Sequence, residues 1–216
     1  MDIRVKNLGK SYKKNGRKIP VIHDFCFIFE QGKITLVKGE SGKGKTTLLT
    51  LLALLQKEDT GEIYFGDRLI SCLNNEEKCK IRRKNIGIVF QDFNLINGLT
   101  VLENIILADV CEGSLSRKEA ENKAVDVLKL LDLEHRRNHY PFELSGGEQQ
   151  RVGVGRAIFK EPDVLICDEP VSNLDSENSK RIVDFLDEYC HKNNKLVIVT
   201  SHNEYFDTCA DRVINI

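Results

Sequence analysis

The sequence of 216 residues lacks any apolar segment long enough to cross a membrane. Its longest apolar-rich run, TTLLTLLALL at 46–55, is far shorter than the roughly 20 residues that a spanning helix needs. The N-terminus, MDIRVKNLGK, contains no apolar core of a secretory signal. We therefore expect a single globular chain in the cytoplasm, with any membrane role exercised through a partner.

Paired cysteine motifs and an excess of charge are also missing. The seven cysteines are odd in number, scattered and without a C-x-x-C pair, which is typical of reduced thiols rather than of disulfides or a zinc site. The net charge is −1, whereas nucleic-acid-binding domains usually carry a basic excess. No nucleic-acid partner is expected, and the short run Arg82-Arg83-Lys84 is interpreted as solvated surface.

What the chain does contain is an alternation of strand and helix signals. Short apolar runs at 34–37, 86–90, 164–167 and 196–200 predict buried strands. Helical spacing with capping boxes predicts helices beginning at Ser116 (with Glu119) and at Thr100 (with Glu103), and a third apolar pattern spans 182–189. Alternating strands and helices predict an α/β fold with a mainly parallel core sheet.

The segment GESGKGKTT, 39–47, follows the first of these strands and fits the phosphate-binding pattern G-x-x-x-x-G-K-[ST]. Glycines let backbone N–H groups surround an anion, and the N-terminus of the next helix points at the same anion. A lysine neutralises terminal phosphates, and a hydroxyl can bind Mg²⁺. The residues predicted to hold ATP–Mg²⁺ here are Gly39, Ser41, Gly42, Gly44, Lys45, Thr46 and Thr47.

The other buried strands each end in polar side chains: Gln91, Asp168-Glu169 and His202. Ligands of open parallel sheets bind beyond the carboxyl ends of the strands, so these groups are expected to meet at the phosphate loop.

Their charges suggest roles. Asp168 is placed to hold Mg²⁺ opposite Thr46, and Gln91 is a further candidate for the metal or for the attacking water. Glu169 can orient or deprotonate that water, a contribution of ~10²–10⁴ in rate. His202 can hydrogen-bond the γ-phosphate. Taken singly, an Asp-Glu-Pro turn or a histidine at a strand end can also be purely structural; their convergence favours a catalytic site.

A second segment with the features of an anion-binding site is LSGGEQQRV, 144–152. Ser145 and Glu148 form a capping box, which predicts a helix. Gly146 and Gly147 expose backbone N–H groups beside the Ser145 hydroxyl, and this combination is a complete anion site. Because the chain has only one phosphate loop, the second segment predicts a twofold dimer in which Ser145, Gly146 and Gly147 contact the ATP held by the other copy.

As a set, these motifs resemble those of the ATP-binding subunits of ABC transporters, over nearly the whole chain. GESGKGKT is similar to the Walker A loop, VLICDEP to Walker B with its catalytic Glu169, and LSGGEQQRV to the family signature. Gln91 corresponds to the Q-loop, SNLD at 172–175 to the D-loop and His202 to the switch histidine. The resemblance further places Tyr12 against adenine, although a strand tyrosine also serves packing alone.

The expected architecture follows the family. Residues 1–216 form one ABC-type ATPase domain. About 1–92 and 160–216 make the P-loop NTPase core with an N-terminal antiparallel β subdomain, and about 93–160 make an inserted α-helical subdomain that carries the signature. The resemblance implies a homodimer around two ATP–Mg²⁺ that powers a separate membrane permease, peripheral on the inner face of the cell membrane.

FQDFNLINGLTVLENI, 90–105, resembles the branch that serves lipoprotein release, macrolide export and antimicrobial-peptide handling. It implies export or extraction of a peptide, lipoprotein or drug-like substrate. The alternatives are an assembly scaffold or nucleic-acid machine built on the same ATPase, although the latter normally carries coiled-coil heptads that are absent here. A small-molecule kinase would have no use for LSGGEQQ.

Two departures from the family pattern carry expectations of their own. Gly153 and Gly155 replace alanines that usually follow the signature, at ~1 kcal/mol each in helix propensity. They bring the rigidity of that helix into question. The sequence ends at RVINI, without the glycine-containing hairpin of many relatives, so we expect a C-terminus that lacks its edge strand and is less tied down.

Overall fold

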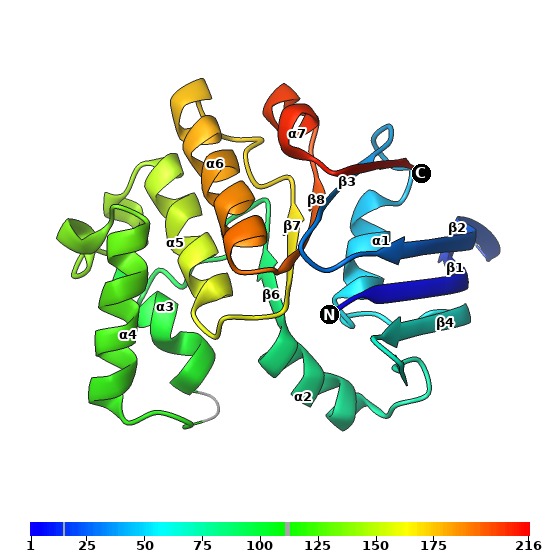
Figure 1. The fold of residues 1–216 in the computed structure, drawn as a ribbon, viewed down its shortest axis with the longest axis horizontal. Helices are drawn as coiled ribbons and strands as arrows, with labels where there is room; N and C mark the ends of the chain where they lie inside the picture. Colours follow the sequence, from blue (N-terminus) through cyan, green and yellow to red (C-terminus); the bar gives the residue numbers. More distant parts are fainter. Residues whose placement is uncertain (15, 111–112) are drawn as a thin grey trace.

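The computed structural model describes residues 1–14, 16–110 and 113–216 as two sheets with helices around them (Figure 1). The larger sheet is wholly parallel, and its strands are, in spatial order, β6 (Ile86–Val89), β7 (Val164–Asp168), β8 (Leu196–Thr200), β3 (Ile34–Lys38) and β9 (Arg212–Asn215). Four of the five are the strands predicted from buried apolar runs. The α/β class with a mainly parallel sheet is confirmed.

The second sheet is antiparallel and is built mostly from the N-terminal part of the chain. Its strands are, in spatial order, β2 (Arg17–Phe29), β1 (Ile3–Lys14), β4 (Thr60–Phe65) and β5 (Arg68–Leu69). This sheet is the N-terminal antiparallel β subdomain that the family resemblance implied.

Helix α1 (Lys45–Leu52) lies between the two sheets (Figure 1). Leu48, Leu51 and Leu52 are fully buried in a core that also contains Ile3 and Phe29 of the antiparallel sheet. The parallel sheet contributes alternate residues of β7 and β8 to the same core: Val164, Ile166, Leu196 and Ile198. Since side chains alternate along a strand, the intervening residues face the opposite side.

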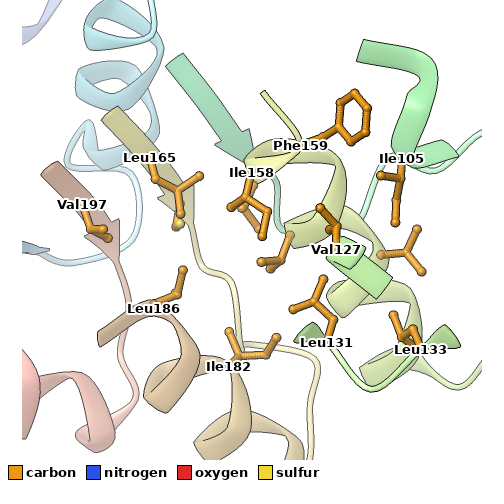
Figure 2. Packing of buried hydrophobic residues seen from close by; sticks show 14 of the residues in the cluster. Ile105, Val127, Leu131, Leu133, Ile158, Phe159, Leu165, Ile182, Leu186 and Val197 are labelled. Atoms are coloured by element: carbon orange, nitrogen blue, oxygen red, sulfur yellow. The ribbon is translucent and has the colours of Figure 1, made fainter. Parts of the chain in front are cut away.

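Three helices lie on that opposite side: α5 (Gly146–Ile158), α6 (Ser176–Lys192) and α7 (Glu204–Cys209). Two more, α3 (Val101–Val110) and α4 (Arg117–Leu130), pack against α5 further from the sheet. Two 3-10 turns, Glu134–Arg136 and Pro141–Glu143, connect α4 to α5. Figure 2 shows how Leu165 and Val197 of the sheet pack against Ile182 and Leu186 of α6, with Ile158 of α5 beside them. The sheet is therefore buried on both faces, as its continuous apolar strands require.

The predicted helix starts are confirmed by the hydrogen bonds of their capping residues. Ser116 caps α4 with Glu119, and Ser145 caps α5 with Glu148, each through a complete capping box. Thr100 and Glu103 exchange the same hydrogen bonds in front of α3. In the described part of the chain, no helix is both long and apolar enough to traverse a lipid bilayer.

Helix α2 (Asn75–Asn85) was not predicted. The mean hydropathy of α2 is low, and Lys78 is its only buried residue among those that the structure describes. The sequence of α2 therefore shows no apolar stripe from which a helix could be predicted. Arg82, Arg83 and Lys84 form its last turn, where cations are favourable. Arg83 and Lys84 are exposed, as interpreted, but the Arg82 guanidinium donates to the Leu54 carbonyl oxygen at 2.8 Å.

The expectation for the C-terminus was wrong. Residues Arg212–Asn215 are themselves the edge strand β9, paired in parallel with β3. The Ile216 N–H continues the ladder by donating to the Lys38 carbonyl oxygen at 3.0 Å. The segment escaped prediction because an edge strand has one open side, and its side chains are mostly exposed.

Gly153 and Gly155 lie inside an uninterrupted α5, which packs against α3 and α4. A Cβ on Gly155 would stand 3.0 Å from Leu131 Cδ1 and 3.1 Å from Ile105 Cδ1. Gly155 thus allows the three helices to approach closely, which is a packing reason for a residue of low helix propensity.

Candidate functional site

The phosphate loop connects β3 to α1 and is shaped by its glycines. Gly42 and Gly44 have φ values of 81° and 103°, in the region that favours glycine. At Gly44 a Cβ would also lie 2.7 Å from Val21 Cγ1 of the antiparallel sheet. Gly44 is the N-cap of α1 and provides no side-chain cap, so the first backbone N–H groups of the helix are left for an anion.

Lys45 is buried beneath this loop, with 9% of its surface exposed. Its ammonium group donates to the carbonyl oxygens of Gly39 at 2.8 Å and Glu40 at 3.3 Å. The same nitrogen lies 3.3 Å from Nε2 of His202. A cation is therefore held at the centre of the loop, where terminal phosphates would bind.

The two carboxylates at the end of β7, those of Asp168 and Glu169, are positioned by Thr200, the last residue of β8. The Thr200 hydroxyl donates to Asp168 Oδ1 at 2.6 Å and accepts from the Glu169 N–H at 3.0 Å. Glu169 has φ 45°, a conformation that costs a non-glycine residue about 1 kcal/mol or more. A second hydrogen bond, from the Glu169 N–H to the Thr200 carbonyl oxygen, holds the backbone in this conformation. Oε1 of Glu169 lies 3.6 Å from His202 Nε2. Strain of this kind concentrates at functional sites, where it fixes the direction of a side chain.

A cavity of about 810 Å³ joins these groups. The predicted site residues that line it are Ser41, Gly42, Gly44, Lys45, Thr46, Thr47, Gln91, Asp168, Glu169 and His202. Residues from four different strand ends therefore meet in one cleft, as the convergence argument required. Gly39 does not line the cavity, but its carbonyl oxygen holds Lys45.

Several other residues also line the cavity but were not among the predicted site residues: Val21, Val171, Ser172, Leu174, Ser201 and Asn203. Ser172 and Leu174 belong to the SNLD segment that the family resemblance singled out, and Ser201 and Asn203 flank His202. Val21 and Val171 belong to no predicted motif, and Val21 reaches the cavity by packing against Gly44 from a distant part of the chain.

Tyr12 is close to the cavity without lining it. Its hydroxyl donates to Gln56 Oε1 at 2.6 Å and lies 3.4 Å from Thr47 Oγ1. The residue is 40% exposed on β1. An exposed ring next to the phosphate loop suits adenine stacking, which remains a prediction.

The oxygen donors in the cavity fit a magnesium ion that is shared with phosphate. The Thr46 hydroxyl, the Gln91 amide and the Asp168 carboxylate offer hard oxygen ligands, which Mg²⁺ prefers. Among the described residues no group of three His, Cys, Asp or Glu side chains could hold a metal ion by itself. A bound Mg²⁺ would complete its shell with phosphate oxygens and water, as it usually does beside a nucleotide.

Ser145, Gly146 and Gly147 do not line this cavity. Ser145 caps α5, and Gly147 is buried against Asn178 of α6, whose side chain would stand 2.5 Å from a Cβ at that position. Gly146 is open, since the nearest atoms to a Cβ there are 3.9 Å away. The N-terminus of α5, where an anion was predicted to bind, thus lies apart from the phosphate loop.

Comparison with known proteins agrees with this geometry. The family model described as "ABC transporter" matches residues 22–172. The chain belongs to this family. It is 37% identical over 206 residues to the lipoprotein-releasing system ATP-binding protein LolD of Cytophaga hutchinsonii, covering 95% of this chain and 93% of that protein. An uncharacterised ABC transporter ATP-binding protein of Methanocaldococcus jannaschii, MJ0796, is 36% identical over 215 residues, which cover 98% of this chain and 92% of that protein.

A solved structure of the same archaeal protein is similar throughout. It is described as a dimeric post-hydrolysis state of the ATP-binding cassette MJ0796 bound to ADP and Pi. The TM-score is 0.93 at 34% identity, with 99% of this chain and 94% of that chain covered. The ABC-type fold, the likeness to the LolD branch and the ATPase class that the motifs indicated are therefore confirmed. The individual site residues and the subdomain boundaries stay predictions.

Proposed function

We propose that this member of the ABC transporter family is the ATP-hydrolysing subunit of a membrane transporter, in which two copies enclose two ATP–Mg²⁺ and drive a separate permease. The observation that supports the proposal is that the phosphate loop and the N-terminus of α5, the two segments suited to an anion, lie apart in one chain. The phosphate loop lines the cavity, whereas Ser145 stands outside it. A second copy, related by a twofold axis, would bring each Ser145 to the nucleotide of its partner.

Within each site the roles follow from position. Gly42, Gly44 and Lys45 hold the phosphates, Thr46, Gln91 and Asp168 hold the ion, and Glu169 orients and deprotonates the attacking water. His202, beside both Lys45 and Glu169, donates to the γ-phosphate. The bound Mg²⁺ would stabilise charge on the phosphoryl oxygens. Tyr12 stacks on adenine.

The substrate we propose is a peptide, lipoprotein or drug-like molecule that is exported or extracted from the membrane. Similarity to LolD, a lipoprotein-releasing ATP-binding protein, supports this, as does the segment 90–105. The subunit would then sit at the inner face of the cell membrane through its permease. A scaffold without a permease is the competing function, and purification from membranes separates the two: a transporter subunit is recovered with an integral membrane protein.

The Glu169→Gln variant tests the sandwich and the role of the glutamate together. Without its general base the protein binds ATP–Mg²⁺ but hydrolyses it slowly, by a factor of ~10² or more, and the closed dimer accumulates. Sedimentation velocity with ATP–Mg²⁺ should show dimers for Glu169→Gln and monomers without nucleotide. Glu188→Gln, on the exposed side of α6, is the matched control and should hydrolyse ATP like the parent. A Glu169→Gln protein that stays monomeric and hydrolyses ATP at the parent rate would contradict the proposal.

A further inference from the structure

The signature of this chain carries a negative charge at the place where a phosphate is expected. Glu148 is the third residue of α5, and its Oε2 accepts hydrogen bonds from both the N–H and the hydroxyl of Ser145, each at 2.9 Å. Only 14% of its side chain is exposed. Burial alone would raise its pKa, but the bonds from Ser145 and from Arg136 outweigh burial and lower the pKa to about 2. Glu148 is therefore ionised throughout the physiological range.

This charge works against anion binding in two ways. A carboxylate next to the α5 N-terminus repels a phosphate at the same helix end. It also accepts the hydrogen bond of the Ser145 hydroxyl, the donor that a phosphate oxygen would need. An uncompensated Glu148 would leave Ser145 and the neighbouring N–H groups poorly suited to a nucleotide.

Arg136 supplies the missing positive charge. Its Nε donates at 2.9 Å to Oε1 of Glu148, the oxygen that Ser145 does not use. The arginine is held by the 3-10 turn before the signature: its own N–H donates to the Leu133 carbonyl oxygen, and its carbonyl oxygen accepts from the His139 N–H, both at 2.9 Å. Its guanidinium also contacts His139, with Nη1 3.3 Å from Nε2.

A second arginine whose charge acts on Glu148, Arg151, forms its hydrogen bond with a different residue. Arg151, one turn further along α5, donates through Nη1 to Oδ1 of Asn178 at 2.8 Å. It acts on Glu148 only through its field. Arg136 is thus the cation that bonds the carboxylate directly.

We propose that Arg136 is a positioning residue for the nucleotide held by the second copy: it neutralises and orients Glu148, so that the Ser145 hydroxyl and the α5 N-terminus can receive the terminal phosphate of that nucleotide. The proposal rests on the proposed function, because it requires a triphosphate presented by a partner. It assigns Arg136 no contact with the nucleotide. Its effect should therefore disappear when the charge of Glu148 is removed.

The test uses the Glu169→Gln protein as parent and measures the ATP–Mg²⁺ concentration that gives half-maximal dimer in sedimentation velocity. Adding Arg136→Gln should raise this concentration about tenfold, because the Glu148 carboxylate then repels the nearby phosphate of the nucleotide, and solvent screens this repulsion only in part. Adding Glu148→Gln as well should restore the parent value. Arg137→Gln removes the same charge from the adjacent exposed residue and should change nothing. Binding of ATP to the monomer, measured at low protein concentration, should be the same in all variants.

Glu148→Gln alone provides a second measurement that does not depend on the folding of the arginine variant. With Arg136 retained and the carboxylate removed, dimerisation should need the parent concentration of ATP, because Arg136 acts only through Glu148 and no bare carboxylate remains; a clearly different requirement would overturn the inference. So would an Arg136→Gln protein that dimerises at the parent concentration, or one that Glu148→Gln fails to restore. If the Glu169→Gln parent itself never dimerises, the sandwich fails and the inference falls with it, which distinguishes the two failures.

Discussion

At the scale of single residues, His191 joins three parts of the fold. Its Nδ1 lies 3.0 Å from the Asp187 carbonyl oxygen, and its Nε2 lies 3.2 Å from Asp211 Oδ2. The same Asp211 oxygen accepts the Ile34 N–H at 2.8 Å, at the start of β3. Burial alone would lower the pKa of His191, but these bonds and the charges of Asp187 and Asp211 outweigh burial and raise it.

A raised pKa makes this contribution to stability depend on pH. Folding favours the protonated imidazole, so the stabilisation is fully present below the unfolded pKa of about 6.5 and is lost as pH rises through the higher folded pKa. We expect His191→Gln to lower the free energy of unfolding at about pH 6 more than at about pH 8. Urea denaturation at both pH values measures the difference. His135→Gln, at an exposed position, should show no such trend, and a loss at His191 that grows with pH would contradict the assignment.

At the scale of elements, the two glycines of α5 have opposite surroundings. A Cβ on Gly153 would be 3.5 Å from the Phe93 carbonyl oxygen, an ordinary contact. A Cβ on Gly155 would press on Leu131, Ile105 and Val127 at 3.0–3.3 Å, and all three are buried. Replacing either glycine by alanine brings the same gain in helix propensity, but only position 153 has room for the added methyl group.

We therefore expect Gly153→Ala to raise the free energy of unfolding by about 0.5–1 kcal/mol. Gly155→Ala should lower it, because overpacking costs about 1–3 kcal/mol and exceeds the propensity gain. Chemical denaturation of the two variants side by side decides this. Equal stabilisation by both would mean that α3 and α4 yield freely to α5, contrary to the packing described.

Elements with several buried residues could be predicted from the sequence, whereas short elements such as α7 and mostly exposed ones could not. β7 and β8 are continuous apolar runs because both of their faces are covered. Helix α4 could be predicted from its capping box and its apolar stripe. Helix α2 and strand β9 are mostly exposed, so neither periodicity nor burial marks them.

The same division holds for the site. Its glycines and lysine could be found because the phosphate loop requires fixed spacing, and Asp168, Glu169 and His202 because they end buried strands. Val21 could not be found, because it reaches the cavity through a tertiary contact with Gly44. The link between Arg136 and Glu148 spans twelve residues and likewise appears only after folding.

At the scale of the whole molecule, the cavity lies apart from the N-terminus of α5. The phosphate loop, the strand ends and the 172–174 segment surround the cavity, whereas Ser145, which caps α5, does not line it. In the account proposed here, two copies complete each other, so each nucleotide contacts Lys45 of one chain and Ser145 of the other. This predicts complementation between two chains that are each inactive alone.

The most direct measurement is therefore the ATPase activity of a mixture of Lys45→Ala and Ser145→Arg proteins. Each variant alone forms no intact site, but half of the dimers in an equal mixture contain one intact site formed by Lys45 of one copy and Ser145 of the other. The account predicts activity well above either variant alone, up to about a quarter of the unmodified protein for random pairing in a twofold dimer. A mixture no more active than the sum of its separate components would contradict it.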